Sequence, residues 1–228
     1  MDTKEFYESM YKHDQRDRPR GSFIYRKLKQ FECNRHDQIL ENIPMGGRLL
    51  DIGCGEGELL FSLKNYFDEL HGLDIAESRI ERINAKINNK NKIHIHLGNA
   101  NEHLPFEDGY FDAIIASDVL EHLFDPYFFV GECSRMLRKQ GTLILHVPNI
   151  AYLPRRLNLL LGQFPTTSDE VGWDGGHLHY FTRSSLKKLL ETEGYNALRI
   201  TSGGIFPNLR RFWGSLLCED ILISGVKK

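Results

Sequence analysis

Short apolar runs alternate with amphipathic stretches through the middle of the chain, beginning at Arg48. Such runs, bounded by polar and glycine-rich segments, are typical of buried strands. They predict strands at Arg48–Ile52, Leu70–Ile75, Lys92–Leu97, Phe111–Ser117 and Thr142–Val147. The stretches between them carry apolar residues at helical spacing. These predict helices at Glu58–Phe67, Glu77–Asn88 and Pro126–Lys139.

The same alternation resumes near the C-terminus. The pattern predicts a helix at Thr182–Glu193, a strand at Ala197–Thr201, a helical piece near Leu209–Leu217 and a strand at Asp220–Val226. Parallel neighbouring strands need long, right-handed crossover connections, and the intervening helices supply them. We therefore predict a doubly wound α/β fold, with a mostly parallel sheet of seven strands and helices on both faces.

The pattern also divides the chain into an N-terminal cap and one main domain. Residues 1–44 are polar, with apolar residues at broadly helical spacing, namely Ile24, Leu28, Phe31, Ile39 and Ile43. They predict a helical cap or lid laid across the domain that residues 45–228 form. Three aromatic residues of the cap, Phe6, Tyr7 and Tyr11, could close over a bound ligand or pack as an ordinary helix face.

Residues 148–181 interrupt the alternation with loops marked by glycine and proline. An interruption this long within a compact domain usually carries function. With residues 1–44, it is expected to build the substrate pocket. The segment places Arg155 and Arg156 beside leucines at 153, 157 and 160, so it could bind an anionic substrate or a membrane surface, or form a solvated helix face.

Composition and charge narrow the functional classes. Hydrophobic residues make up 41% of the 228 and charged residues 26%, which is typical of a globular protein. The formal net charge of −2 gives no overall attraction to phosphates, so a nucleic-acid partner is not expected. The four cysteines lie far apart and the N-terminus is too charged for a signal peptide. We expect reduced thiols, a cytoplasmic location and no stable membrane insertion.

The sharpest chemical signal is the run from Leu49 to Gly57, in which a buried strand leads into three alternating glycines and then a helix. Glycine lets the backbone turn tightly and approach a ligand, and the helix start presents N–H groups. The Gly-Lys-Ser/Thr ending of a Walker A loop is absent. A dinucleotide fingerprint requires glycine where Glu58 stands, so NAD is the less favoured alternative. Asp74, at the end of the next strand, can accept hydrogen bonds from both hydroxyls of an adenosine ribose.

Several segments in this order resemble the class I S-adenosylmethionine-dependent methyltransferases. The segments are Leu50–Gly57, Leu73–Ile75, Gly98–Ala100, Leu104–Phe106, Phe111–Asp112 and Gly141–Leu143. The resemblance covers residues 46–150 closely and the remainder loosely. It implies a Rossmann-like sheet with one antiparallel strand near the C-terminus, and S-adenosylmethionine as the cofactor, with S-adenosylhomocysteine as its product.

The resemblance also implies which residues hold the cofactor. Asp51 and the turn of Gly53, Cys54, Gly55 and Gly57 would hold its amino acid end. Asp74 would hold the ribose, and Ile75 would pack on the adenine. Asn99 and Ala100 would contact the adenine edge, where an amide oxygen can accept a hydrogen bond from the exocyclic amine. Ser117, at the end of the fourth strand, completes the expected set.

Three histidines are candidate catalytic residues. His122 follows the fourth strand, where ligands bind on open α/β sheets, and can act as a general base or simply bond a neighbouring carboxylate. His177 and His179 share one face if their stretch is extended, so both could face a pocket. Asp118, Glu121 and His122 also match a D/E-x-x-E-H pattern of quinone-biosynthesis O-methyltransferases, where it is associated with a divalent cation. Much of the wider family carries similar residues without a metal, so no metal is expected.

These observations predict a methyltransferase that transfers a methyl group to a hydroxyl of a small metabolite by in-line displacement. An N-methyltransferase of a small amine or amino sugar is the nearest alternative. A module that binds S-adenosylmethionine without catalysis is an alternative of another class. The acceptor and the oligomeric state stay open.

Overall fold

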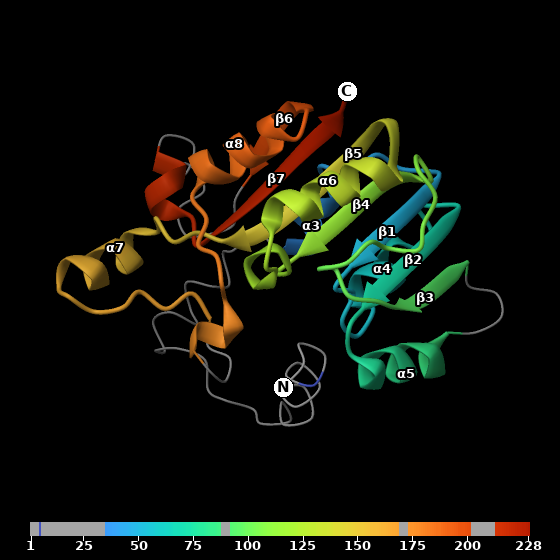
Figure 1. The fold of residues 1–228 in the computed structure, drawn as a ribbon, viewed down its shortest axis with the longest axis horizontal. Helices are drawn as coiled ribbons and strands as arrows, with labels where there is room; N and C mark the ends of the chain where they lie inside the picture. The colour runs from blue at the N-terminus through green and yellow to red at the C-terminus, as the bar shows by residue number, and fades with distance from the viewer. Residues whose placement is uncertain (1–4, 6–34, 88–91, 169–172, 202–212) are drawn as a thin grey trace.

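The computed structural model describes residues 5, 35–87, 92–168, 173–201 and 213–228, and in that part of the chain one seven-stranded sheet forms the centre (Figure 1). Its strand order is β3-β2-β1-β4-β5-β7-β6. The strands are β1 (Arg48–Ile52), β2 (Glu69–Asp74), β3 (Ile93–Leu97), β4 (Phe111–Ser117), β5 (Leu137–Pro148), β6 (Tyr195–Thr201) and β7 (Asp220–Lys227). β7 pairs antiparallel with both β5 and β6, and the other pairings are parallel.

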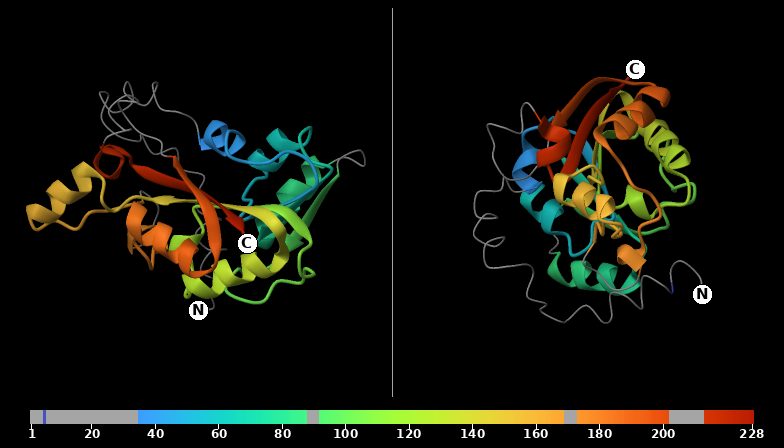
Figure 2. Two further views of the ribbon diagram at one scale, coloured as in Figure 1. Left: turned by 90° about the horizontal axis from the view of Figure 1, so that it is seen from above. Right: turned by 90° about the vertical axis from the view of Figure 1, so that its left-hand side faces the viewer.

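Helices cover both faces of this sheet (Figures 1 and 2). One face carries α3 (Arg35–Leu40), α4 (Glu58–Leu63) and α5 (Glu77–Lys86), and the other carries α6 (Pro126–Met136) and α8 (Arg183–Thr192). The 3-10 turn η1 (Leu120–His122) follows β4 and α7 (Leu153–Leu160) follows β5, whereas the 3-10 turn η2 (Trp173–Gly176) lies between α7 and α8 in the chain. The predicted doubly wound, Rossmann-like α/β class with one antiparallel C-terminal strand is confirmed.

Alternation along β1 supplies both halves of the core. Leu50 and Ile52 point into the cluster beneath α6 and α8, whereas Leu49 points into the cluster beneath α3 and α4. A strand that is buried on both faces has apolar residues at nearly every position. This explains why β1 could be predicted from its continuous apolar run. Among the described residues, no helix has the length and apolarity needed to cross a bilayer.

Most predicted element boundaries hold within two residues, but the helix predicted at Glu58–Phe67 ends four residues early, at Leu63, and the strand predicted at Thr142–Val147 begins five residues earlier, at Leu137. The helix predicted at Pro126–Lys139 ends three residues early, at Met136. Leu137 already pairs with Phe111 of β4, and the register then shifts so that Ala113 pairs with Thr142. Gln140 has φ +62, which a helix does not allow. The strand partner therefore overrides the local helical pattern. In the C-terminal region, residues 213–217 are helical, within the predicted piece.

The predicted cap is described only in part. Within α3, Ile39 is buried against the sheet, and Ile43 is buried just beyond its end. The apolar residues Ile24, Leu28 and Phe31, and the proposed lid residues Phe6, Tyr7 and Tyr11, lie outside the described residues. The division into a cap of residues 1–44 and a domain of residues 45–228 therefore stays a prediction.

Three histidines stack at the β2–β3 edge of the sheet. His71 lies on His94 and His96, with ring centroids 5.0 and 5.2 Å apart, and its Nδ1 is 3.0 Å from Nε2 of His96. Phe106 and Phe111 pack edge-on against His71. Burial, helped by the two neighbouring histidines, lowers the pKa of His71 to about 4, although Glu69 opposes the shift.

This stack predicts a loss of stability in mild acid. An unfolded histidine binds a proton below about pH 6.5, whereas folded His71 resists protonation down to about pH 4. The unfolded chain therefore binds more protons, and the free energy of unfolding falls as the pH drops from 6.5 to 4. In His71→Phe we expect that fall to be smaller by roughly 1–3 kcal/mol, measured by urea unfolding across this range. Identical pH slopes for the two proteins would contradict the assignment.

Candidate functional site

A cleft opens at the carboxyl ends of the parallel strands β1, β2 and β4. The parallel register sets Ile52 of β1 beside Leu73 of β2 and Ala116 of β4, so the loops that follow these strands leave the same edge. The cleft encloses about 560 Å³, part of it open to solvent. It is lined by Ile52, Gly53, Leu73, Asp74, Ile75, Arg79, Gly98, Asn99, Ala100, Asn101, Asp118, Val119, His122 and Leu123. Its size is that of a small-ligand site.

The glycine turn closes one end of this cleft. Gly53, Gly55 and Gly57 all have positive φ, and Gly57 caps the start of α4. At Gly53 a Cβ atom would lie 2.3 Å from Cγ2 of Val119, so only glycine fits between the two loops. The Gly53 N–H donates to the carbonyl of Leu73 at 2.7 Å, which fixes the turn against β2.

Asp74 is the best-placed acceptor in the cleft. Its buried carboxylate accepts one hydrogen bond per oxygen, from Gly55 N–H at 3.0 Å and from Ala76 N–H at 2.9 Å. Each carboxylate oxygen has a second lone pair for a further donor. Arg79 lies 3.7 Å away and keeps negative charge favourable there. A carboxylate held in this way fits the two hydroxyls of a ribose.

The predicted cofactor residues divide into cleft lining and supporting wall. Gly53, Asp74, Ile75, Asn99 and Ala100 line the cleft. The described lining set does not include the other predicted residues, which are Asp51, Cys54, Gly55, Gly57 and Ser117.

Two of these wall residues are buried behind the glycine turn. Burial raises the pKa of Asp51 to about 7, although Arg35 opposes the shift. Burial also raises the pKa of the Cys54 thiol, so that side chain packs as an apolar group.

Asn99 and Asn101 form a small amide network at the other end of the cleft. The Oδ1 atom of Asn99 accepts from the backbone N–H of Asn101 at 3.1 Å, and the Asn99 amide donates to Glu102. Asn101 in turn accepts from the N–H of Phe124 at 2.8 Å. Asn101 was missed from the sequence because this role depends on a residue more than twenty positions away. Arg79 was missed too, although it lies in the first turn of α5, five residues after Asp74.

Asp118 lies at the junction of the cleft and an ion network. It adopts φ +56 after β4, and its carboxylate contacts Nδ1 of His146 at 2.9 Å and the guanidinium of Arg35. Burial alone would raise the pKa of Asp118, but His146 and Arg35 outweigh it and lower the pKa. The same contact raises the pKa of buried His146 against its desolvation. Sequence reasoning did not find Arg35 or His146, which lie 83 and 28 positions from Asp118.

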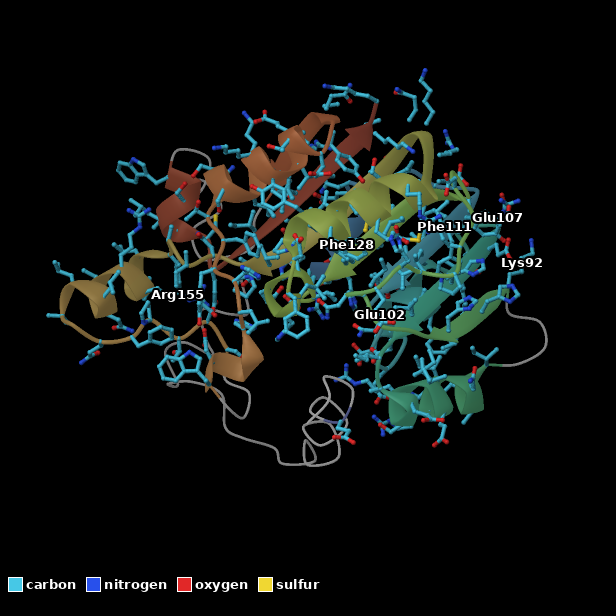
Figure 3. All side chains as sticks on the ribbon, in the orientation of Figure 1. Lys92, Glu102, Glu107, Phe111, Phe128 and Arg155 are labelled. Atoms are coloured by element: carbon cyan, nitrogen blue, oxygen red, sulfur yellow. The ribbon has the colours of Figure 1, made fainter. Side chains whose placement is uncertain are left out.

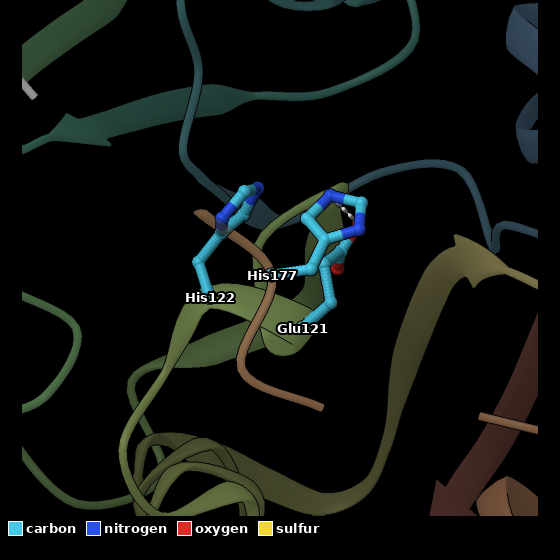
Figure 4. Close-up of side chains that lie close together, drawn as sticks. All are labelled: Glu121, His122 and His177. Atoms are coloured by element: carbon cyan, nitrogen blue, oxygen red, sulfur yellow. Dashed lines mark ion pairs between the residues drawn. The ribbon is translucent and has the colours of Figure 1, made fainter. Parts of the chain in front are cut away.

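His122 and His177 meet where η1 follows β4 (Figure 4). Their rings pack edge to face with centroids 4.6 Å apart, and His122 lines the cleft. Nδ1 of His122 donates to the carbonyl of Gly176 at 3.4 Å, which leaves the lone pair on Nε2. Burial, and then His177, lowers the pKa of His122 to about 4. His122 is therefore neutral at physiological pH.

A short chain of hydrogen bonds orients His177. The Thr167 hydroxyl donates to Asp174 at 2.6 Å and accepts from Nδ1 of His177 at 2.7 Å. The lone pair of His177 then lies on Nε2, 3.8 Å from a carboxylate oxygen of Glu121. Asp174 adopts φ +46 and also accepts from the N–H groups of Thr167 and Ser168. The turn Trp173–Gly176 therefore helps to hold the His177 ring in one orientation, through Asp174 and Thr167.

His179 lies apart from this pair. Its backbone N–H donates to the carbonyl of Glu121 at 3.0 Å, and its ring Nε2 donates to the carbonyl of Phe124 at 3.3 Å. It does not belong to the described cleft lining. The two histidines of the His-Leu-His stretch thus have different partners, and His177 is the one that joins His122.

Glu121, His122 and His177 could hold a divalent cation. One ligand atom from each lies within 4.8 Å of the others. The sequence pattern grouped Asp118 with Glu121 and His122. In the structure Asp118 instead contacts His146, and His177 is the third residue close to Glu121 and His122. Imidazole and carboxylate together suit zinc and similar transition metals.

Arg155 does not face a ligand, because it is a buried anchor at the base of α7 (Figure 3). Its guanidinium donates to the carbonyls of Asn149 at 2.8 Å, Glu219 at 2.7 Å and Thr166 at 3.2 Å. The predicted alternative in which Arg155 binds an anionic substrate is therefore wrong. Its charge is used to hold irregular backbone together.

The doubly wound sheet and the glycine-edged cleft with its buried carboxylate are typical of a Rossmann-like, nucleotide-binding class of domain. Residues 50–145 match the model of a methyltransferase domain. The chain is 30% identical over 165 residues to a probable S-adenosylmethionine-dependent methyltransferase of Mycolicibacterium smegmatis, covering 71% of this chain and 58% of that protein. It is 32% identical over 124 residues to the ubiquinone biosynthesis O-methyltransferase of Pelagibacter ubique, covering 54% and 49%.

A solved S-adenosylmethionine-dependent methyltransferase of Archaeoglobus fulgidus has the same fold, with a TM-score of 0.63, 20% identity and coverage of 90% of this chain and 100% of that one. The chain spans about half the length of the curated relatives it matches. With this evidence, the chain carries a class I S-adenosylmethionine-dependent methyltransferase domain. S-Adenosylmethionine is the cofactor of that family.

Removing the charge at Asp74 should weaken cofactor binding. In Asp74→Asn one carboxylate oxygen becomes a donor, and a hydrogen bond to a charged group contributes about 1.5–3 kcal/mol. We therefore expect the dissociation constant for S-adenosylmethionine to rise by roughly 10- to 150-fold, measured by calorimetry.

Asp112→Asn is the matched control, because Asp112 also accepts from a backbone N–H, that of Arg48, but at the opposite edge of the sheet. It should bind the cofactor as the wild type does. Melting temperatures of both variants separate lost binding from lost folding. Tight binding of NADH with no heat from S-adenosylmethionine would contradict the cofactor assignment.

Proposed function

We propose that this protein transfers a methyl group from S-adenosylmethionine to a hydroxyl of a small metabolite. The observation that carries the proposal is the half-buried imidazole of His122, which lines the cleft, donates from Nδ1 to the carbonyl of Gly176 and has a pKa that burial lowers to about 4. A hydroxyl is a weak nucleophile until its proton is removed, so a base at this position suits an oxygen acceptor. The Pelagibacter ubique relative is named as an O-methyltransferase, which supports the same acceptor class.

The described residues fit the cofactor in three places. Asp74 offers two oxygens for a ribose, Ile75 and Ala100 offer apolar surface for a base, and Gly53 lines the cleft with backbone alone. When bound, the cofactor supplies a methyl group that its sulfonium already makes electrophilic. The protein therefore has to align the acceptor rather than activate the methyl group, and alignment supplies as much as ~7–11 kcal/mol.

In this proposal His122 takes the acceptor proton at Nε2. His177, oriented by Thr167 and Asp174, packs against the His122 ring and fixes its position. His179 contacts Phe124 and is the second candidate base. Asp51, behind the glycine turn, and Ser117, at the end of β4, complete the amino acid end of the cofactor site.

The acceptor pocket is proposed to form from residues 148–181 and the N-terminal residues 1–44. Thr167, Asp174 and His177 place the first of these segments beside His122. Arg35, from the second, reaches Asp118 at the cleft. We propose a cytoplasmic small-molecule enzyme with no nucleic-acid partner, in keeping with buried thiols at Cys54 and Cys133 and a net charge of −2.

Replacing His122 should reduce turnover far more than cofactor binding. A positioned base contributes 10²- to 10⁴-fold, so we expect His122→Gln to lower kcat by about 100-fold or more. The dissociation constant for S-adenosylmethionine should change only a few-fold. His103→Gln is the control, because the side chain of His103 is 79% exposed and lies outside the cleft lining. Turnover is measured as S-adenosylhomocysteine formed with pooled hydroxylated metabolites and labelled cofactor.

The pH profile gives a second readout. Because the pKa of His122 is lowered to about 4, the wild-type rate should not fall as the pH drops from 8 to 6. Undiminished turnover in a variant lacking both His122 and His179 would remove these histidines from the mechanism. If the protein methylated only amines, the acceptor would be an amine rather than a hydroxyl. If it bound the cofactor but gave no product with any acceptor, it would be a non-catalytic binding module.

We propose that the reaction needs no metal, although Glu121, His122 and His177 could hold one. Dialysis against EDTA should leave the rate of S-adenosylhomocysteine formation unchanged. A rate that falls after dialysis and returns with zinc or magnesium would instead assign those three side chains to a metal. In that case, His177→Ala should abolish the recovery.

A further inference from the structure

Three charged side chains lead from the cleft into the interior of the sheet. Asp118, directly after β4, lines the cleft, and its Oδ1 atom lies 2.9 Å from Nδ1 of His146 on β5. Nε2 of His146 lies 3.9 Å from a carboxylate oxygen of Asp220, at the start of β7. Both ring nitrogens of this buried histidine therefore face carboxylates. The arrangement suits an imidazolium, because only that form of histidine donates from both nitrogens.

The contact with His146 keeps Asp118 ionised and in one place. Burial alone would lower the pKa of His146, but the Asp118 carboxylate outweighs burial and raises that pKa. The backbone N–H of Asp118 also donates to the carbonyl of His146 at 2.9 Å, in a residue whose φ is +56. Two hydrogen bonds to one residue therefore fix both the backbone and the side chain of Asp118.

Asp118 lies beside the glycine turn. Ile52 pairs with Ala116, so Gly53 leaves β1 next to the end of β4. Val119, the residue after Asp118, packs so closely on Gly53 that a Cβ atom there would lie 2.3 Å from Cγ2 of Val119. The Asp118 side chain is 39% exposed, so a ligand in the cleft can reach it. Its carboxylate therefore faces the cleft at the turn proposed to hold the amino acid end of the cofactor.

Negative charge is needed at this turn, because the amino acid end of S-adenosylmethionine carries an ammonium group. Within the described cleft lining, the carboxylates are those of Asp74 and Asp118. Asp74 is the one suited to the ribose. Asp51 lies outside that lining, and burial raises its pKa to about 7. Asp118 is therefore the ionised carboxylate that the described lining presents beside the turn.

The partners of Asp118 also match an amino acid. Its Oδ1 atom contacts His146, and its Oδ2 atom contacts the guanidinium of Arg35. An aspartate beside an arginine complements the ammonium and carboxylate groups that share the α-carbon of an amino acid. Each oxygen of Asp118 has a second lone pair, so it can accept from an ammonium group while His146 and Arg35 keep their contacts.

We propose that Asp118 accepts hydrogen bonds from the ammonium group of S-adenosylmethionine, and that His146 is the positioning residue that holds this carboxylate in the cleft. Asp118 thereby supplies, at the surface of the cleft, the negative charge that buried Asp51 does not present there. The inference concerns binding of the methyl donor. It holds for a hydroxyl acceptor, for an amine acceptor and for a non-catalytic binding module alike.

Two ligands that differ in the amino acid end test the proposal. S-Adenosylhomocysteine carries that end, methylthioadenosine lacks it, and both carry the ribose. In Asp118→Asn we expect the dissociation constant for S-adenosylhomocysteine to rise roughly 10- to 150-fold, because hydrogen bonds between charged groups are lost. The dissociation constant for methylthioadenosine should not change. Calorimetry measures both, and Asp74→Asn is the matched comparison, because it should weaken both ligands.

His146→Gln tests the positioning role. It should weaken S-adenosylhomocysteine by roughly 3- to 10-fold and leave methylthioadenosine unchanged. Combined with Asp118→Asn it should add no further loss, because it acts through Asp118. A histidine that only supports the fold would instead weaken both ligands, or add its loss to that of Asp118→Asn, and either result would overturn its positioning role.

The outcomes separate recognition of the ammonium group from misfolding. Equal losses for the two ligands in Asp118→Asn, or unchanged binding of S-adenosylhomocysteine, would overturn the proposal. Melting temperatures show whether each variant is folded during the measurement. The wild type gives a test that needs no variant, because an analogue of S-adenosylhomocysteine without the amino group should bind roughly 10- to 150-fold more weakly. Equal binding of that analogue would also overturn the proposal. None of these measurements needs an acceptor, so they are independent of the methylation assays.

Discussion

The parallel pairing of β1 with β2 and β4 is the constraint on which the site depends. Backbone hydrogen bonds set Ile52 beside Leu73 and Ala116, so three loops leave the sheet at one edge. Gly53, Asp74 and Asp118 reach the same cleft for that reason. A shift of this register by one residue would turn Leu49 and Leu50 to the wrong faces and separate the loops at once. Core packing and ligand geometry therefore rest on the same hydrogen bonds.

The parts of this arrangement that the sequence could predict are local. A buried strand, a glycine turn and a helix start occur within ten residues, and each has a direct backbone reason to be there. Asp74 was found because it ends the next strand. The helix expected to run to Lys139 shows the limit, because pairing of Leu137 with Phe111 decides its end and no local pattern records that contact.

The part of the cleft around Asp118, His122 and His177 was harder to predict because its contacts are long-range or depend on unusual backbone. Arg35, Asp118 and His146 come together from three distant segments. Asp174 and Thr167 orient His177 through a loop in which three consecutive residues have positive φ. A histidine pair spaced by two residues suggested one shared face, yet the hydrogen bonds of His177 and His179 lead to different partners. Spacing alone does not determine tautomer or partner.

The contact between Gly53 and Val119 joins the two halves of the cleft. No side chain larger than hydrogen fits at residue 53, since Cγ2 of Val119 already occupies that space. The loop after β1 and the loop after β4 therefore pack directly against each other at this point. A larger side chain at residue 119 would therefore have to displace the glycine turn that borders the same cleft.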